Sequence, residues 1–92
     1  MIYQYKNIYI KKEGERLTIK ELNSPFDVGV AKIIKRECLK QVCVAERAGY
    51  TAQELSDMIN GRRLIKACDI QRLAKALGVT SDDIYKAGLK GE

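Results

Sequence analysis

The chain has 92 residues, which is enough for one domain with a modest core and leaves no room for a separate catalytic domain. Its 17 Lys and Arg residues outnumber its 12 Asp and Glu residues, and the net charge of +5 favours a polyanionic partner. No apolar run is long enough to cross a bilayer, and the N-terminus lacks the apolar segment of a signal peptide. We therefore expect a cytoplasmic protein without a membrane partner.

The cysteines and the absence of histidine argue against metal binding and catalysis. Cys38, Cys43 and Cys68 stand at no spacing typical of metal ligands, and the chain contains no His. An odd, unpatterned set of thiols indicates reduced cysteines, and we expect at least two of them to face the core. No nucleophile stands beside a suitable base. The sequence predicts no enzyme, no metal site and no cofactor.

Residues 2–22 alternate apolar and polar side chains on both sides of Glu13-Gly14, which is typical of two strands joined by a tight turn. We predict a β-hairpin over residues 1–23, with a loop of two or four residues. The opposed pairs are then Ile10 with Leu17, Ile8 with Ile19, Lys12 with Glu15, and Lys6 with Glu21. Apolar groups occupy both faces, so the hairpin either pairs with a second copy of the chain or covers the first helix of its own chain.

A helical domain is predicted over residues 24–92. Ser24 is a suitable N-cap, Pro25 suits the first helical position, and Asp27 can complete a capping box. The first helix is expected to run to about Leu39. Two further helices are expected, one over 66–77 that ends at Gly78 and one after the capping sequence 80–83.

Between these helices, residues 41–63 have the pattern of a helix, a tight turn and a second short helix. Ala45 is small where the two helices would cross, and Gly49 stands where the chain must turn with a positive φ. Leu55 would face back into the angle between the helices. The inward set is Val44, Ala48, Tyr50, Leu55 and Met58.

The second helix of this pair has its own start and stop signals. Thr51 and Glu54 form a capping box, and Gly61 after Asn60 suits a left-handed C-cap. With Leu55, Met58 and Ile59 turned inward, an outward polar stripe remains that would face the major groove of DNA. The stripe consists of Gln53, Ser56, Asp57 and Asn60.

Residues 39–84 resemble the lambda-repressor-like helix-turn-helix family, the XRE-type group of phage repressors, Cro-like proteins and bacterial regulators. The resemblance rests on Val44-Ala45, Gly49, Leu55, Asn60-Gly61 and the stretch LAKALGVTSDDI. It implies five helices, sequence-specific binding to double-stranded DNA without a cofactor, and commonly a homodimer. The expected fold is therefore mainly α, a five-helix lambda-repressor-like domain preceded by a β-hairpin.

The resemblance also assigns contact residues. Gln41 matches the family's first DNA-contacting Gln, Ala52 and Gln53 match its base-reading positions, and Asn60, Arg62 and Arg63 match its backbone-contacting segment. An amide such as that of Gln53 can bond adenine in a bidentate pair. The full set of predicted DNA-binding residues is Gln41, Thr51, Ala52, Gln53, Ser56, Asp57, Asn60, Arg62 and Arg63.

Two functions follow as alternatives. The first is a small transcriptional regulator of the phage or bacterial repressor type. The second is a protein-interaction module, antitoxin-like or the partner of an anti-repressor, with DNA binding secondary or lost. Glu54 and Asp57 keep the second open because they place negative charge near the phosphates. Asp57 either accepts a hydrogen bond from cytosine or limits non-specific affinity.

Overall fold

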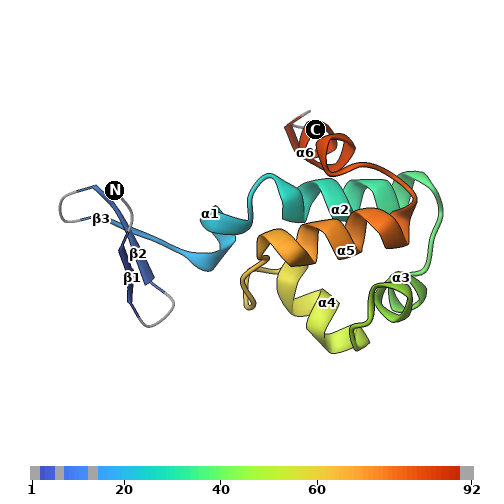
Figure 1. Cartoon of the computed structure of the whole chain (residues 1–92), viewed down its shortest axis with the longest axis horizontal. Coiled ribbons are helices and arrows are strands. Elements are labelled where there is room, and N and C mark those ends of the chain that lie inside the picture. The colour runs from blue at the N-terminus through green and yellow to red at the C-terminus, as the bar shows by residue number, and fades with distance from the viewer. Residues whose placement is uncertain (1–2, 6–7, 13–14, 90–92) are drawn as a thin grey trace.

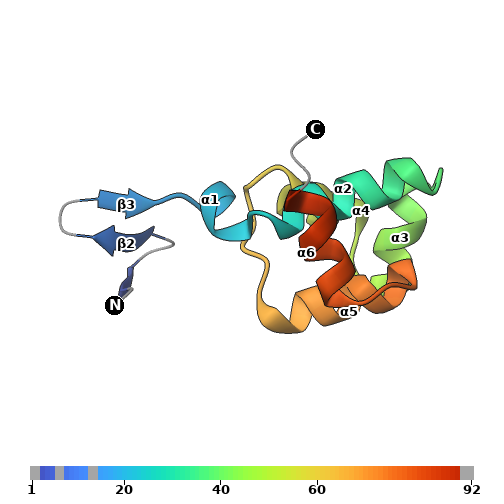
Figure 2. The same ribbon diagram turned by 90° about the horizontal axis from the view of Figure 1, so that it is seen from above.

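The part of the chain described by the computed structural model, residues 3–5, 8–12 and 15–89, contains six helices and three short strands. The strands lie at one end of the molecule and the larger helices at the other, with the first helix between them (Figures 1 and 2). The mainly α class is confirmed. The elements are β1 (Tyr3–Tyr5), β2 (Ile8–Lys12), β3 (Glu15–Leu17), α1 (Ile19–Asn23), α2 (Phe26–Arg36), α3 (Gln41–Ala48), α4 (Ala52–Ile59), α5 (Ala67–Leu77) and α6 (Ser81–Leu89).

The predicted two-stranded hairpin over residues 1–23 is not supported. Three short strands pair antiparallel in the order β1-β2-β3. Lys12 lies opposite Glu15 as predicted, but Leu17 lies opposite Tyr9 rather than Ile10. Ile19 and Glu21, expected opposite Ile8 and Lys6, belong to α1; Lys6 is outside the described residues.

A capping box explains why the predicted second strand stops early. The Thr18 hydroxyl accepts a hydrogen bond from the Glu21 N–H at 3.1 Å, and the Thr18 N–H donates to the Glu21 carboxylate at 3.0 Å. These two bonds satisfy N–H groups that a short helix otherwise leaves unpaired, so the helical turn prevails over the alternating pattern. With α1, the described residues contain six helices, one more than the five that were expected.

The junction between α1 and α2 differs by one residue from the prediction. Ser24 ends α1, Pro25 is the N-cap of α2 without a side-chain hydrogen bond, and the Ser24–Pro25 peptide is cis. Asp27 makes no capping box: its carboxylate accepts from the Val28 N–H and is fully buried. Helix α2 ends at Arg36, earlier than predicted.

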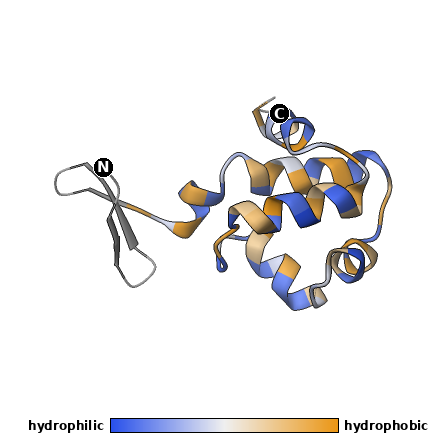
Figure 3. Ribbon diagram, in the orientation of Figure 1, coloured by the Kyte–Doolittle hydropathy of each residue, from blue (hydrophilic) through white to orange (hydrophobic). Residues whose placement is uncertain are grey.

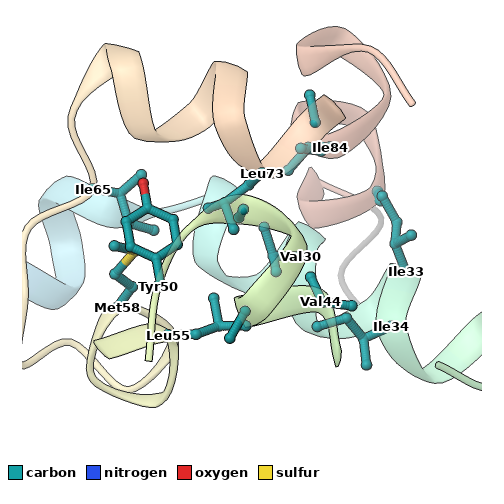
Figure 4. Close-up of a cluster of buried hydrophobic side chains, with 14 residues drawn as sticks. Val30, Ile33, Ile34, Val44, Tyr50, Leu55, Met58, Ile65, Leu73 and Ile84 are labelled. Carbon is teal, nitrogen blue, oxygen red and sulfur yellow. The ribbon is translucent and has the colours of Figure 1, made fainter. Parts of the chain in front are cut away.

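The core lies between α2, α3, α4, α5 and α6. Hydrophobic and hydrophilic residues alternate along each helix, so that one face of each is apolar (Figure 3). Figure 4 shows the apolar side chains gathered between the helices. The inward set predicted for the helix-turn-helix is buried, which confirms that pattern: Val44, Ala48, Tyr50, Leu55 and Met58. Ile59, also predicted to turn inward, is half-buried and packs against the core.

The prediction for the cysteines is wrong, because Cys38, Cys43 and Cys68 are all exposed. Cys38 follows the end of α2 and has a positive φ of 56°. In α3 the buried positions are Val44, Ala45 and Ala48, and this helical phase turns Cys43 toward solvent. The prediction relied on the apolar character of cysteine, which does not show which side of a helix a residue occupies.

Candidate nucleic-acid interface

Helices α3 and α4 are joined by a turn that only glycine makes without strain. Gly49 ends α3 with a φ of 86°, and its N–H donates to the carbonyl of Glu46 at 3.1 Å. A side chain there would also stand 2.5 Å from the Arg72 guanidinium. Ala45 is fully buried, as expected where the two helices approach. The predicted helix–turn–helix geometry is therefore present.

Tyr50 fixes the turn from inside. The Tyr50 hydroxyl donates to the Asp69 carboxylate, and the Arg72 guanidinium lies 4.3 Å from the ring centroid. Arg72 also donates to the carbonyl oxygens of Ala48 and Gly49. Burial and the hydrogen bond to Asp69 raise the pKa of the Tyr50 phenol. These contacts hold the start of α4 against α5.

Helix α4 begins with the predicted capping box. The Thr51 hydroxyl accepts from the Glu54 N–H at 3.0 Å, and the Thr51 N–H donates to the Glu54 carboxylate at 2.8 Å. Asn60 caps the other end, and Gly61 follows with a φ of 81°. The start and the end of α4 are therefore set largely by local sequence.

The outward stripe of α4 is present. Leu55 and Met58 are fully buried (Figure 4). On the other side of the helix, Ala52, Gln53 and Asn60 are exposed and Ser56 and Asp57 are half-buried. The Asn60 amide donates to the Ser56 carbonyl and hydroxyl oxygens, which ties the far end of the stripe to the helix itself.

Asp57 is the centre of a polar network on this stripe. One carboxylate oxygen accepts from the Gln53 amide at 2.9 Å and from the Arg62 guanidinium at 2.8 Å. Its backbone carbonyl accepts from the N–H groups of Arg62 and Arg63. The Arg62 hydrogen bond, followed by that of Gln53, lowers the pKa of Asp57. Asp57 thus orients one predicted base-reading side chain and one predicted phosphate-binding side chain together.

The second arginine has its own carboxylate. Arg63 lies 3.0 Å from the Glu54 carboxylate, with both side chains about two-fifths exposed. The Thr51 N–H and the Arg63 guanidinium hold the pKa of Glu54 below its ordinary value. Arg62 and Arg63 are therefore both paired with acidic residues of α4, which the sequence pattern did not predict.

Gln41 is exposed at the first position of α3. The N-cap, Lys40, makes no side-chain hydrogen bond, while the N–H groups of Cys43 and Val44 donate to the Lys40 carbonyl. The first N–H groups of α3 thus receive no capping side chain. A helix start of this kind suits an anionic group.

Two residues near this surface were missed by the sequence reasoning. Lys20 and Asn23 belong to α1; Lys20 bonds to Ile59 at the end of α4, and Asn23 bonds to Arg63 in the segment that follows. The alternating pattern of residues 2–22 indicated a strand up to the residue before Asn23, so α1 was not predicted. The capping pattern Thr18-x-x-Glu21 is the signal that finds α1.

Within residues 3–5, 8–12 and 15–89, no group of His, Cys, Asp or Glu is arranged to hold a metal ion. In the same part of the chain no helix is both long enough and apolar enough to span a bilayer.

Two comparisons with known proteins bear on this surface. A family model described as a helix-turn-helix domain matches residues 35–84, which include α3, α4 and α5. A comparison with curated proteins found no match to the chain.

Proposed function

The chain belongs to the helix-turn-helix domain family, and from this premise we propose that it is a sequence-specific DNA-binding transcriptional regulator of the repressor type. In this proposal α4 enters the major groove and its outward stripe reads base edges. The observation that carries the proposal is the position of Arg62 and Arg63 directly after the exposed stripe of α4. We further propose that the protein has no catalytic activity.

The proposed contacts divide into base reading and backbone binding. Gln53 lies in the first turn of α4, where an amide can donate to and accept from one adenine. Ala52 is small and exposed, which leaves room for a base edge or a thymine methyl group. Arg62, Arg63 and the start of α3 at Gln41 bind phosphates and set the register of the duplex.

The ion pairs within the surface have a consequence for affinity. To bind phosphates, Arg62 must leave Asp57 and Arg63 must leave Glu54, or each arginine must contact its carboxylate and a phosphate together. Ion pairs at a protein surface contribute little to stability because water screens them, so the exchange is inexpensive. The remaining carboxylates repel phosphates, which lowers affinity for DNA of every sequence. Specificity therefore depends more on base contacts than on net charge.

We propose a homodimer, because two α4 helices related by a two-fold axis match a palindromic operator with half-sites about one helical turn apart. Among the residues that the structure describes, the strand order β1-β2-β3 leaves an open edge on each of the outer strands, β1 and β3. A second copy of the chain can pair with such an edge.

Selection of bound duplexes from a random pool tests this function. The expected result is a short motif, repeated as a palindrome, that binds at least about 1,000-fold more tightly than random duplex. Recovery of no motif, together with no shift of random duplex at low salt, would contradict DNA binding.

A second candidate function is favoured by the same ion pairs. If Glu54 and Asp57 keep Arg62 and Arg63 paired, the surface suits a mixed-charge protein partner, as in an antitoxin or the partner of an anti-repressor. Gel-shift titration of random duplex at two salt concentrations separates the candidates. A DNA-binding surface loses affinity steeply as salt rises, whereas a protein-binding surface gives no shift at either concentration.

A further inference from the structure

Helix α1 is bonded to the segment that follows α4. Asn23 is 1% exposed, and its side chain makes three hydrogen bonds, one to the last turn of α4 and two to the segment after it. Its amide donates to the carbonyl oxygens of Met58 at 3.0 Å and Arg63 at 2.9 Å. Its carbonyl oxygen accepts from the Ile65 N–H at 2.8 Å. One side chain therefore fixes both ends of residues 58–65.

Lys20 makes a second set of contacts, at the end of α4. Its ammonium donates to the Ile59 carbonyl oxygen at 3.0 Å and lies 2.6 Å from the buried carboxylate of Asp27. A cation near the last carbonyls of a helix is also favoured by the helix dipole. Lys20 thus connects α1, α2 and the end of α4.

Gly61 packs directly against α1. A Cβ built on Gly61 would stand 2.8 Å from the Lys20 Cβ and 3.2 Å from its Cα. Gly61 also has a φ of 81°, which other residues rarely adopt. The path of the segment is therefore restricted by its own backbone, by Asn23 and by Lys20.

We propose that Asn23 and Lys20 are positioning residues for DNA binding: they hold the segment after α4 so that Arg62 and Arg63 reach the phosphates. This inference rests on the proposed function. A loop held in its binding conformation loses less conformational entropy when it binds. Both residues precede residues 35–84, so the support comes from outside the matched helix-turn-helix region.

The first test uses hydrogen exchange and needs no DNA. In the full chain, Asn23→Ala removes the acceptor of the Ile65 N–H. Protection of that amide is expected to fall about fivefold more than protection of the α5 amides. Ile84→Val is the matched control, because it weakens the core away from this segment. An equal loss at Ile65 and in α5 would overturn the positioning role.

The second test measures random-duplex binding from 50 to 200 mM salt. If Asn23→Ala displaces both arginines, the log–log salt slope flattens by about 2. Over this range the parent then loses about tenfold more affinity than the variant. Ile84→Val is expected to keep the parent slope. Gly61→Ala, which disturbs the same contact from the loop side, is expected to reproduce the flattening and covers the case in which Asn23→Ala fails to fold.

The outcomes separate this inference from the proposed function. A parent that does not bind duplex contradicts the proposed function and the DNA part of the inference, while the Ile65 amide still tests the positioning contact. A parent that binds, with unchanged slopes in Asn23→Ala and Gly61→Ala, overturns the inference alone. When Arg62→Ala and Arg63→Ala are already present, adding Asn23→Ala is expected to change affinity less than about twofold; a larger loss would also overturn it.

Discussion

Gly29 of α2 lies so close to Ile84 of α6 that a Cβ on Gly29 would stand 2.0 Å from the Ile84 carbonyl oxygen. A similar contact occurs at the other end of the same crossing, where a Cβ on Gly88 would stand 2.0 Å from the Pro25 carbonyl oxygen. The two helices therefore approach each other through backbone rather than through side chains. This close crossing holds Ile84 in the core.

Gly29→Ala is expected to destabilise the protein by about 2 kcal/mol, even though Ala is the better helix former by about 1 kcal/mol. The reason is that the contacted atom is backbone and cannot rotate away. Urea unfolding followed by circular dichroism measures the change. Gly78→Ala is the control, because nothing lies within 4 Å of its Cβ and only its φ of 72° opposes the substitution. An equally stable or more stable Gly29→Ala protein would contradict the close crossing.

Gln53→Ala is expected to relax the preference at one base pair by about 1–3 kcal/mol and to leave affinity for random duplex nearly unchanged. Duplex selection with each protein measures the preference. Gln71→Ala, an exposed residue of the same type on α5, is the control and should select the parent motif. A Gln53→Ala protein with the parent motif and stringency would remove Gln53 from the base-reading set.

Replacing both Arg62 and Arg63 by Ala is expected to weaken binding to all duplexes alike and to flatten the log–log salt slope by about 2. The matched control replaces Lys35 of α2 and Lys86 of α6 by Ala, which removes as much positive charge as the double arginine variant. Helix α6 lies on the opposite side of α2 from α4 (Figure 1). If both double variants flatten the slope equally, the arginines act through net charge and make no local contact.

Arg62→Ala is expected to raise the pKa of Asp57 toward its ordinary value of 3.8, because the Arg62 hydrogen bond is the largest cause of the lowered pKa. A lowered pKa in the folded protein contributes stability above pH 3.8 that is lost as the pH falls further. The variant therefore loses less stability on acidification. Carboxyl carbon shifts measured by NMR during an acid titration report the pKa. Glu54 is the internal control, since Thr51 and Arg63 lower its pKa; equal shifts at both residues would contradict the pairing.

Removal of residues 1–17 is expected to convert the proposed dimer to a monomer while α1 to α6 remain folded. The cut precedes Thr18, so the cap of α1 and the Asn23 contacts are kept. A short sheet with open edges is marginal by itself and gains stability from a second copy. Sedimentation at several concentrations measures the mass. An unchanged mass after truncation, or a monomeric parent, would show that residues 1–17 do not join two chains.

The sequence by itself determined the helix-turn-helix. Gly49, the capping box of Thr51 and Glu54, and the inward set around Leu55 are local signals, because each concerns residues within one or two turns of each other. The same locality explains the errors at the N-terminus. Alternation favoured a strand at Thr18–Leu22, whereas capping favoured a helix, and the structure has the helix. The contact assignments for Gln41, Gln53, Arg62 and Arg63 stay predictions, as does the division at residue 23.

Only the tertiary structure decided which residues distant in sequence meet. The local sequence around Gly29 and Gly88 does not indicate a contact, but both are sites where two backbones touch. In the sequence nothing distinguishes Asn23 from other polar residues. In the structure residues 58–65 lie within hydrogen-bonding distance of its side chain. The pairing of Arg63 with Glu54 likewise depends on the backward turn after α4. Such contacts depend on how the helices cross, and that is set by the packing of the whole core rather than by any local pattern.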